Sequence, residues 1–97
     1  MTVEEAIELI NTSNNCYSLG YAKDLLKDCE FMKRQDYTGY GLYIKATDIY
    51  KVEDGYIGVR GIPSLKSDRI LYVDCVELCI AKEYEAVQTT TYVPKNN

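Results

Sequence analysis

The sequence predicts an α+β domain in which two N-terminal helices pack on an antiparallel meander of about four strands. Apolar residues recur at helical spacing in the first third of the chain, whereas apolar and polar residues alternate from Leu42 onward. Between two alternating runs lies the dipeptide Asp54-Gly55, a strong signal for a tight hairpin turn. Helices that precede a run of consecutive strands are typical of the α+β class.

Two helices account for the N-terminal third. Thr2 and Glu5 have the spacing of a capping box, which predicts a helix over residues 3–11. Ser18 can cap a second helix, and residues 35–41 are predicted to form a break after it. The apolar stripe of this second helix has six members: Tyr21, Ala22, Leu25, Leu26, Cys29 and Met32.

Alternation in the next segment predicts a hairpin and its register. With Asp-Gly as the two-residue loop, Val52 pairs with Ile57. Tyr50 then pairs with Val59, and both pairs lie on the apolar face that the helices are expected to cover. Asp48 falls on the same face, which predicts either a local bulge or a hydrogen-bonded carboxylate.

The whole chain, residues 1–97, is predicted to form one domain, because a chain of this length holds a single hydrophobic core. Residues 70–81 are expected to form a third strand or a broken pair of strands, and residues 85–93 a final strand, after a loop that contains Pro63.

The charge balance limits the classes of partner. Fifteen acidic and eleven basic side chains give a net charge of −4. This argues against direct binding to nucleic acid, which depends on many Lys and Arg contacts to phosphates, and it favours solubility or a basic partner. The N-terminus lacks the positive charge of an export signal, and no apolar run approaches the ~20 residues of a membrane-spanning helix. The expected location is therefore the cytoplasm, without membrane contact.

The cysteines are predicted to be reduced thiols that bind no metal. Without an export signal, free thiols are expected rather than disulfides. The chain has no histidine and no Cys-x-x-Cys motif, so the usual spacings of a zinc site are missing, and we expect no cofactor. The four cysteines are Cys16, Cys29, Cys75 and Cys79.

Few residues suggest catalysis. Without histidine, the chain cannot form a serine–histidine or cysteine–histidine pair. The glycines of residues 39–61 lead into a predicted strand rather than a helix, so they do not match a phosphate-binding loop. A carboxylate pair, such as Asp48 with Asp74 or Glu77, could serve acid–base chemistry. Solvated carboxylates are far more common, and we expect no enzymatic activity.

The sheet face opposite the helices is the predicted contact surface. Tyrosine and arginine are enriched among interface hot spots, because a rigid ring and a forked donor lose little entropy on contact. A merely solvated sheet face is the alternative. The residues predicted to bind a partner are Tyr43, Lys45, Lys51, Glu53, Asp54, Tyr56 and Arg60.

The stretch from Leu42 to Pro94 resembles a group of short, uncharacterised α+β proteins of gut bacteria and their mobile elements. The resemblance is carried by the segments DIYKVEDGYIGVRG, PSLKSD and AKEYEAVQTTTYVPK. Usual members have Glu where this chain has Asp68, a change that keeps the charge. The resemblance implies helices on a meander and carries no catalytic motif. If the resemblance holds, a protein encoded on mobile genetic elements is expected to have an anti-defence role, such as that of an anti-CRISPR inhibitor.

These observations predict a non-enzymatic protein-binding domain. The best specific hypothesis is an inhibitor of a nucleic-acid-handling protein, whose basic channel a small acidic protein can occupy by charge matching. The expected partner is therefore a protein. The specific hypothesis requires that this protein has a basic, nucleic-acid-binding surface. Two alternatives remain: a small housekeeping or assembly module that forms an oligomer, and an enzyme that uses carboxylates or a thiol.

Overall fold

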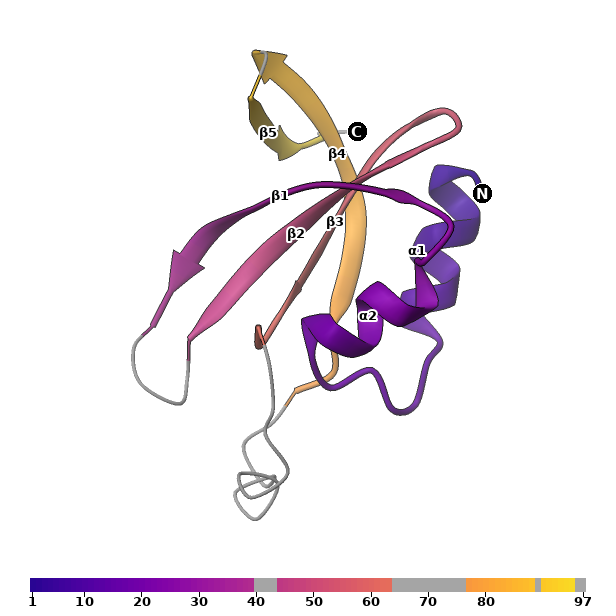
Figure 1. The fold of residues 1–97 in the computed structure, drawn as a ribbon, viewed down its shortest axis with the longest axis vertical. Coiled ribbons are helices and arrows are strands. Elements are labelled where there is room, and N and C mark those ends of the chain that lie inside the picture. Colours follow the sequence, from indigo (N-terminus) through magenta and orange to yellow (C-terminus); the bar gives the residue numbers. More distant parts are fainter. Residues whose placement is uncertain (40–43, 64–76, 89, 96–97) are drawn as a thin grey trace.

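The computed structural model describes residues 1–39, 44–63, 77–88 and 90–95. These residues form two helices and one antiparallel sheet whose five strands lie in sequence order (Figure 1). The predicted α+β class and meander are confirmed, with five strands where about four were expected. The elements are α1 (Val3–Asn11), α2 (Leu19–Leu25), β1 (Glu30–Thr38), β2 (Lys45–Val52), β3 (Gly55–Gly61), β4 (Ile80–Gln88) and β5 (Thr91–Pro94).

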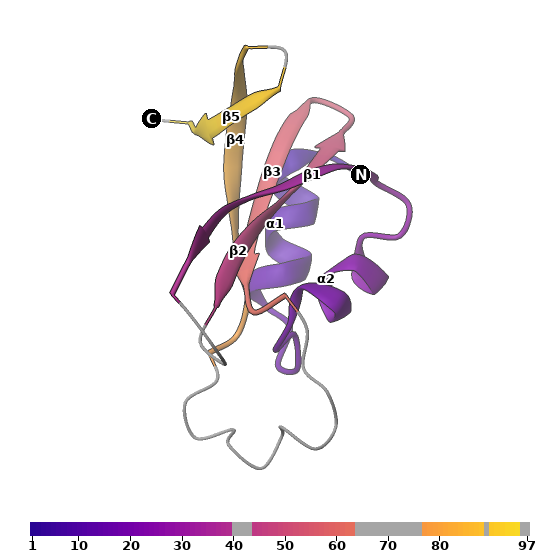
Figure 2. The same cartoon turned by 60° about the vertical axis from the view of Figure 1, so that its left-hand side comes forward.

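Both helices lie on the same face of the sheet, α1 against β3 and β4 and α2 against β3 (Figure 2). The capping box forms as predicted, since Thr2 Oγ1 accepts from the Glu5 N–H and Glu5 Oε1 accepts from the Thr2 N–H. Ser18 caps α2 by accepting from the Tyr21 N–H at 3.4 Å. The main core fills the space between the helices and strands β2 to β4. Its members include Ala6, Ile10, Leu19, Ala22, Leu26, Ala46, Tyr50, Ile57, Val59 and Ala81.

The second helix is shorter than predicted, because the chain leaves the helix after Leu26 and enters β1 four residues later. Cys29 and Met32, which were assigned to the helical stripe, lie beyond α2, and the predicted break at 35–41 overlaps β1. Two register shifts interrupt the pairing of β1 with β2 and obscure the alternation that marks a strand. Periodicity alone does not separate helix from strand in so short an apolar segment.

The hairpin between β2 and β3 turns earlier than predicted. Val52 pairs with Gly55 rather than with Ile57, so the loop consists of Glu53 and Asp54. The predicted pairing is therefore wrong by two positions. Because side chains alternate with a period of two, this shift leaves every residue on its predicted face.

Contacts with the start of α1 hold this turn. Asp54 Oδ1 accepts a hydrogen bond from the Val3 N–H at 2.7 Å, and the Glu53 N–H donates to the Met1 carbonyl at 3.0 Å. The N-terminal ammonium lies 3.2 Å from Glu53 Oε2. The Asp54 carboxylate thus satisfies a backbone donor at a helix start, where the helix dipole also favours negative charge. The sequence of the hairpin alone does not predict these contacts, because they involve the start of α1.

A buried ion pair connects β1 to β2. The Asp48 side chain is fully buried, and its two oxygens accept from Arg34 Nε and Nη2 at 2.6 and 3.1 Å. Of the two alternatives predicted for Asp48, the hydrogen-bonded carboxylate is the one found. The paired carboxylate raises the pKa of Arg34 through its hydrogen bonds. A buried carboxylate without a cation is strongly destabilising. Arg34 of β1 therefore supplies the cation that Asp48 of β2 requires.

A second, smaller cluster lies on the sheet face away from the helices. Ile49, Tyr84 and Tyr92 are buried in it, with Met32 and Tyr56 packed against them. The two edge strands are also joined across the curled sheet. Side chains of β1 donate to carbonyls near the C-terminal end of the chain, Gln35 Nε2 to Tyr92 O and Lys33 Nζ to Thr90 O, both at 2.9 Å. This face is therefore partly closed rather than simply solvated.

Replacing Arg34 with Met is expected to lower the free energy of unfolding by about 3 kcal/mol, because the buried Asp48 carboxylate loses its cation. This is the lower end of the usual range for a broken buried pair, since the Arg34 side chain is 31% exposed. The matched control is Lys51→Met, an exposed cation on β2 that should change stability by less than about 0.5 kcal/mol. Urea unfolding measures both. Equal losses in the two variants would contradict a special role for the pair.

Replacing Gly58 with Ala is expected to lower stability by about 2 kcal/mol. A Cβ at Gly58 would overlap the ring of Tyr84, so the buried tyrosine ring would have to move. Gly20→Ala is the control, because a Cβ there would meet its nearest neighbour, Ser18 Oγ, at 3.6 Å, and alanine favours a helix by about 0.5 to 1 kcal/mol. The midpoint temperature of thermal unfolding should therefore fall for Gly58→Ala and rise for Gly20→Ala. A Gly58→Ala protein as stable as the wild type would refute this packing.

Candidate functional site

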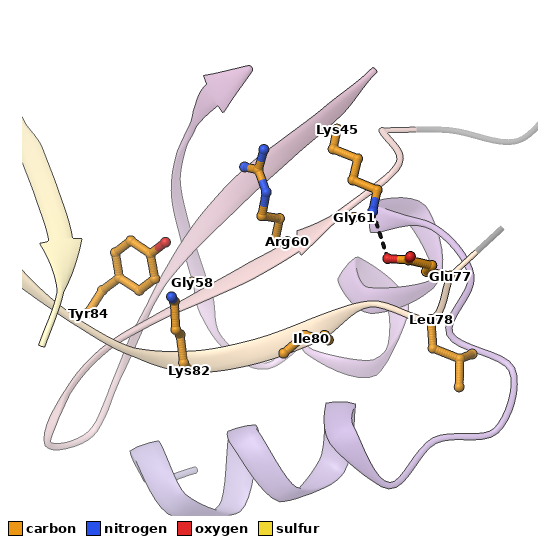
Figure 3. A pocket seen from close by; sticks show the side chains of 9 residues that line it. All are labelled: Lys45, Gly58, Arg60, Gly61, Glu77, Leu78, Ile80, Lys82 and Tyr84. Carbon is orange, nitrogen blue, oxygen red and sulfur yellow. Dashed lines mark hydrogen bonds and ion pairs between the residues drawn. The ribbon is translucent and has the colours of Figure 1, made fainter. Parts of the chain in front are cut away.

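A hollow of about 280 Å³ lies on the sheet face opposite the helices, over β2, β3 and the start of β4 (Figure 3). We call it the basic hollow, because three of its side chains are cationic and one is acidic. Its side chains are Lys45, Arg60, Glu77, Leu78, Ile80, Lys82 and Tyr84.

Strand register places these residues together. In the β3–β4 ladder, Arg60 pairs with Ile80 and Gly58 with Lys82. Ile80, Lys82 and Tyr84 are two residues apart along β4, so all three point to the same face. Figure 3 shows Arg60 and Lys82 directed to the same side of the strands. The Tyr84 ring lies against Gly58, and burial raises the pKa of its hydroxyl.

Arg60 is held in position by uncharged acceptors. Its Nη1 donates to the Asp36 carbonyl at 2.9 Å and to Thr47 Oγ1 at 3.0 Å, and its Nη2 donates to Thr38 Oγ1. Asp36 has φ 56°, the left-handed conformation, which Asp tolerates better than most residues. The guanidinium is therefore fixed between β1 and β2 by groups that do not neutralise its charge.

The charges of the hollow are unevenly paired. Lys45 Nζ lies 2.8 Å from Glu77 Oε2, and this hydrogen bond lowers the pKa of Glu77. Among the residues that the structure describes, no carboxylate lies within ion-pair distance of Arg60 or Lys82. The hollow therefore carries an excess of positive charge on a chain whose net charge is −4.

Negative charge gathers on the other side of the molecule. A second, more open hollow lies where α1 meets the β2–β3 turn and β4. We call it the acidic hollow. Glu4 and Glu8 are exposed there, whereas Asp54 is occupied with the start of α1 and Glu83 lies 3.4 Å from Lys95. Its lining residues are Val3, Glu4, Ile7, Glu8, Asp54 and Glu83.

The structure brings together only part of the predicted contact surface. Lys45 and Arg60 line the basic hollow as neighbours. Tyr56 is half-buried against Tyr92, with ring centroids 5.0 Å apart, so much of its surface is already used in packing. Tyr43 lies outside the described residues. The other three, Lys51, Glu53 and Asp54, lie at the opposite end of β2 from Lys45, close to the start of α1.

Ile80, Lys82 and Tyr84 belong to the hollow but were not among the predicted contact residues. The alternation Ile-Ala-Lys-Glu-Tyr along residues 80–84 is a signal that could have found them. These residues lie beside Arg60 because of the register in which β4 pairs with β3. The sequence of the loop between two strands does not specify such a register.

The candidate carboxylates have separate partners. Asp48 is buried with Arg34, while Glu77 is exposed beside Lys45, and Asp74 lies outside the described residues. In the part of the chain that the structure describes, no group of three or more potential metal ligands occurs. Nor is any described helix long and apolar enough to cross a membrane.

The described cysteines lack the features of reactive thiols. Cys16, Cys29 and Cys79 are free, and burial raises the pKa of each, to about 12 for Cys79. A nucleophilic cysteine needs the opposite shift, toward the thiolate at neutral pH. These three residues therefore give no support to a thiol-dependent activity. Cys75 lies outside the described residues.

Comparison of the chain with known proteins gave no relative. No protein-family model matches it, and neither the curated proteins nor the solved structures include a match. The resemblance to short proteins of gut bacteria therefore stays a prediction, and arguments about function depend on the geometry of this chain alone.

Proposed function

We propose that this chain is a non-enzymatic, cytoplasmic protein-binding domain that contacts its partner through the basic hollow. The observation that carries the proposal is a fixed arginine beside exposed aliphatic surface. Ile80, which pairs with Arg60 across the β3–β4 ladder, is 62% exposed. Arginine is enriched among interface hot spots, and the fully buried core of an interface is more apolar than its rim.

The geometry also lowers the cost of binding. Three hydrogen bonds that Arg60 donates, to Thr38, Thr47 and the Asp36 carbonyl, hold its guanidinium before any partner arrives. A side chain that is already ordered loses less entropy on contact, about 0.5 to 1.5 kcal/mol less than a free one. Arg60 lies on β3, the central strand of the sheet, and its backbone pairs with Thr47 of β2 and with Ile80 of β4.

Inhibition of a nucleic-acid-handling protein is the narrower hypothesis. Charge matching to a basic channel requires an acidic surface, and the acidic hollow with Glu4 and Glu8 is the surface that fits it. Of the contact residues predicted from the sequence, Lys45 and Arg60 lie in the basic hollow, whereas Asp54 lines the acidic hollow. The narrower hypothesis therefore concerns α1, and a single experiment can separate the two surfaces.

Capture of partners by charge variants tests the proposed contact surface. A tagged wild-type chain is compared with Ile80→Glu and with Val87→Glu in a lysate of the encoding organism, and bound proteins are quantified by mass spectrometry. Val87 is the matched control, since it is 58% exposed on the same strand but does not line the hollow. A partner bound by the wild type and Val87→Glu should be recovered about tenfold less by Ile80→Glu. Equal recovery by all three would contradict the proposal.

The same assay addresses the narrower hypothesis. A double variant with Glu4→Gln and Glu8→Gln should lose a basic, nucleic-acid-handling partner, and binding of that partner to the wild type should weaken as salt rises. Asp24→Asn combined with Asp28→Asn removes the same charge from exposed positions around α2 and serves as the control. Charge matching through α1 is ruled out if the captured partner has no basic surface. It is also ruled out if the Glu4→Gln, Glu8→Gln variant retains the partner as well as the control variant does.

A further inference from the structure

The charge of the basic hollow determines what kind of partner segment can enter it. On the assumption that the proposed function is correct, we infer that the hollow takes an acidic, extended segment of the partner protein. A carboxylate of that segment lies against Arg60 and Lys82, and an apolar side chain two residues away lies against Ile80. This occupant differs from the basic partner that the net charge of the chain favours.

The first argument is the unpaired positive charge. Lys45 is matched by Glu77 at 2.8 Å, but Arg60 and Lys82 have no carboxylate partner among the described residues. Two unpaired cations that line one hollow are a local exception on a chain of net charge −4, and an incoming carboxylate would offset their charge.

The second argument is the donor geometry of Arg60. A guanidinium has five N–H groups, and the three bonds to Asp36, Thr47 and Thr38 use three of them. Within the described residues, two N–H groups are thus available for an outside acceptor. A carboxylate matches such a fork, and charge-assisted bonds of this kind are roughly twice as strong as neutral ones.

The third argument is the apolar surface beside the cations. Ile80 and Lys82 are two residues apart on β4, about 6.6 Å at the rise of a strand. An extended segment repeats its side chains on one face at the same spacing, so an acidic residue and an apolar residue at positions i and i+2 fit together. A free inorganic anion would leave the exposed Ile80 in water.

A nucleotide fits this surface less well than an acidic peptide. Recognition of a base normally uses an exposed aromatic ring for stacking. The aromatic ring of the hollow belongs to Tyr84, which is 5% exposed and packs on Gly58. Its faces are therefore not free for a base.

The test is an NMR titration of the whole chain labelled with ¹⁵N. The probe is the capped peptide Ac-Gly-Glu-Ser-Leu-Ser-Glu-Gly-NH2 at millimolar concentration. Parallel titrations use the same peptide with Gln in place of both Glu, the same peptide with Lys in place of both Glu, and inorganic phosphate. We expect the Glu peptide to shift amide signals of Arg60, Ile80 and Lys82 but not those of α1, and to bind at least about tenfold more tightly than the other probes.

Variants then assign the contacts. Lys82→Gln and Ile80→Ser should each weaken the Glu peptide by about five- to tenfold, while Lys27→Gln, an exposed lysine beyond α2, should leave its affinity unchanged. Both hollow residues are exposed, so the fold should persist, and the spectrum reports this directly. The inference is overturned by absence of binding, by shifts centred elsewhere, by equal binding of the Gln peptide, or by phosphate binding as tightly as the Glu peptide.

The two proposals can fail separately. If a protein partner is captured in an Ile80-dependent manner but the Glu peptide does not bind, only the acidic occupant is wrong. If the Glu peptide binds as expected but no captured protein depends on Ile80, the hollow is an acidic-peptide site and the proposed partner-binding function is wrong.

Discussion

The pair between Arg34 and Asp48 is the interaction on which the exposed side of the sheet depends. Asp48 is fully buried, so its carboxylate requires a cation and hydrogen-bond donors from within the protein. Arg34 supplies both from β1, and this fixes β1 beside β2 at that position. With β1 in place, Asp36 and Thr38 reach Arg60 on β3. The buried Asp48 on the helix-covered face thus fixes the strand that positions Arg60 on the opposite face.

The curl of the sheet gives this chain two different surfaces. On the face away from the helices, Tyr84 and Tyr92 pack with Ile49, and Gln35 and Lys33 connect β1 to carbonyls near β5. Part of this face is thereby withdrawn from solvent. The basic hollow remains open next to the packed tyrosines. Tyr56, which the sequence marks as a contact residue, packs here against Tyr92 and contributes to the fold.

The distribution of charge matters more than its sum. The net charge of −4 suggests a basic partner, yet the charges are unevenly distributed. The acidic hollow lies beside α1, while β2, β3 and β4 carry Lys45, Arg60 and Lys82 on the opposite face. At physiological salt, charges separated by more than about 8 Å are largely screened, so a partner responds to the local surface it contacts. This small domain thus presents two surfaces of opposite sign.

The sequence by itself determined the class of the fold, the start of both helices and the face to which each residue of β2 and β3 points. These features follow from capping residues and from a period of two, which act over a few neighbouring positions. The tertiary structure decided the rest. The hairpin turns at Glu53-Asp54 because Asp54 binds the start of α1, and residues after Leu26 form a strand because buried Asp48 needs Arg34. The hollow itself depends on the pairing of β4 with β3, which joins residues about twenty positions apart. Such contacts gain their energy only when distant segments meet, so no local pattern records them.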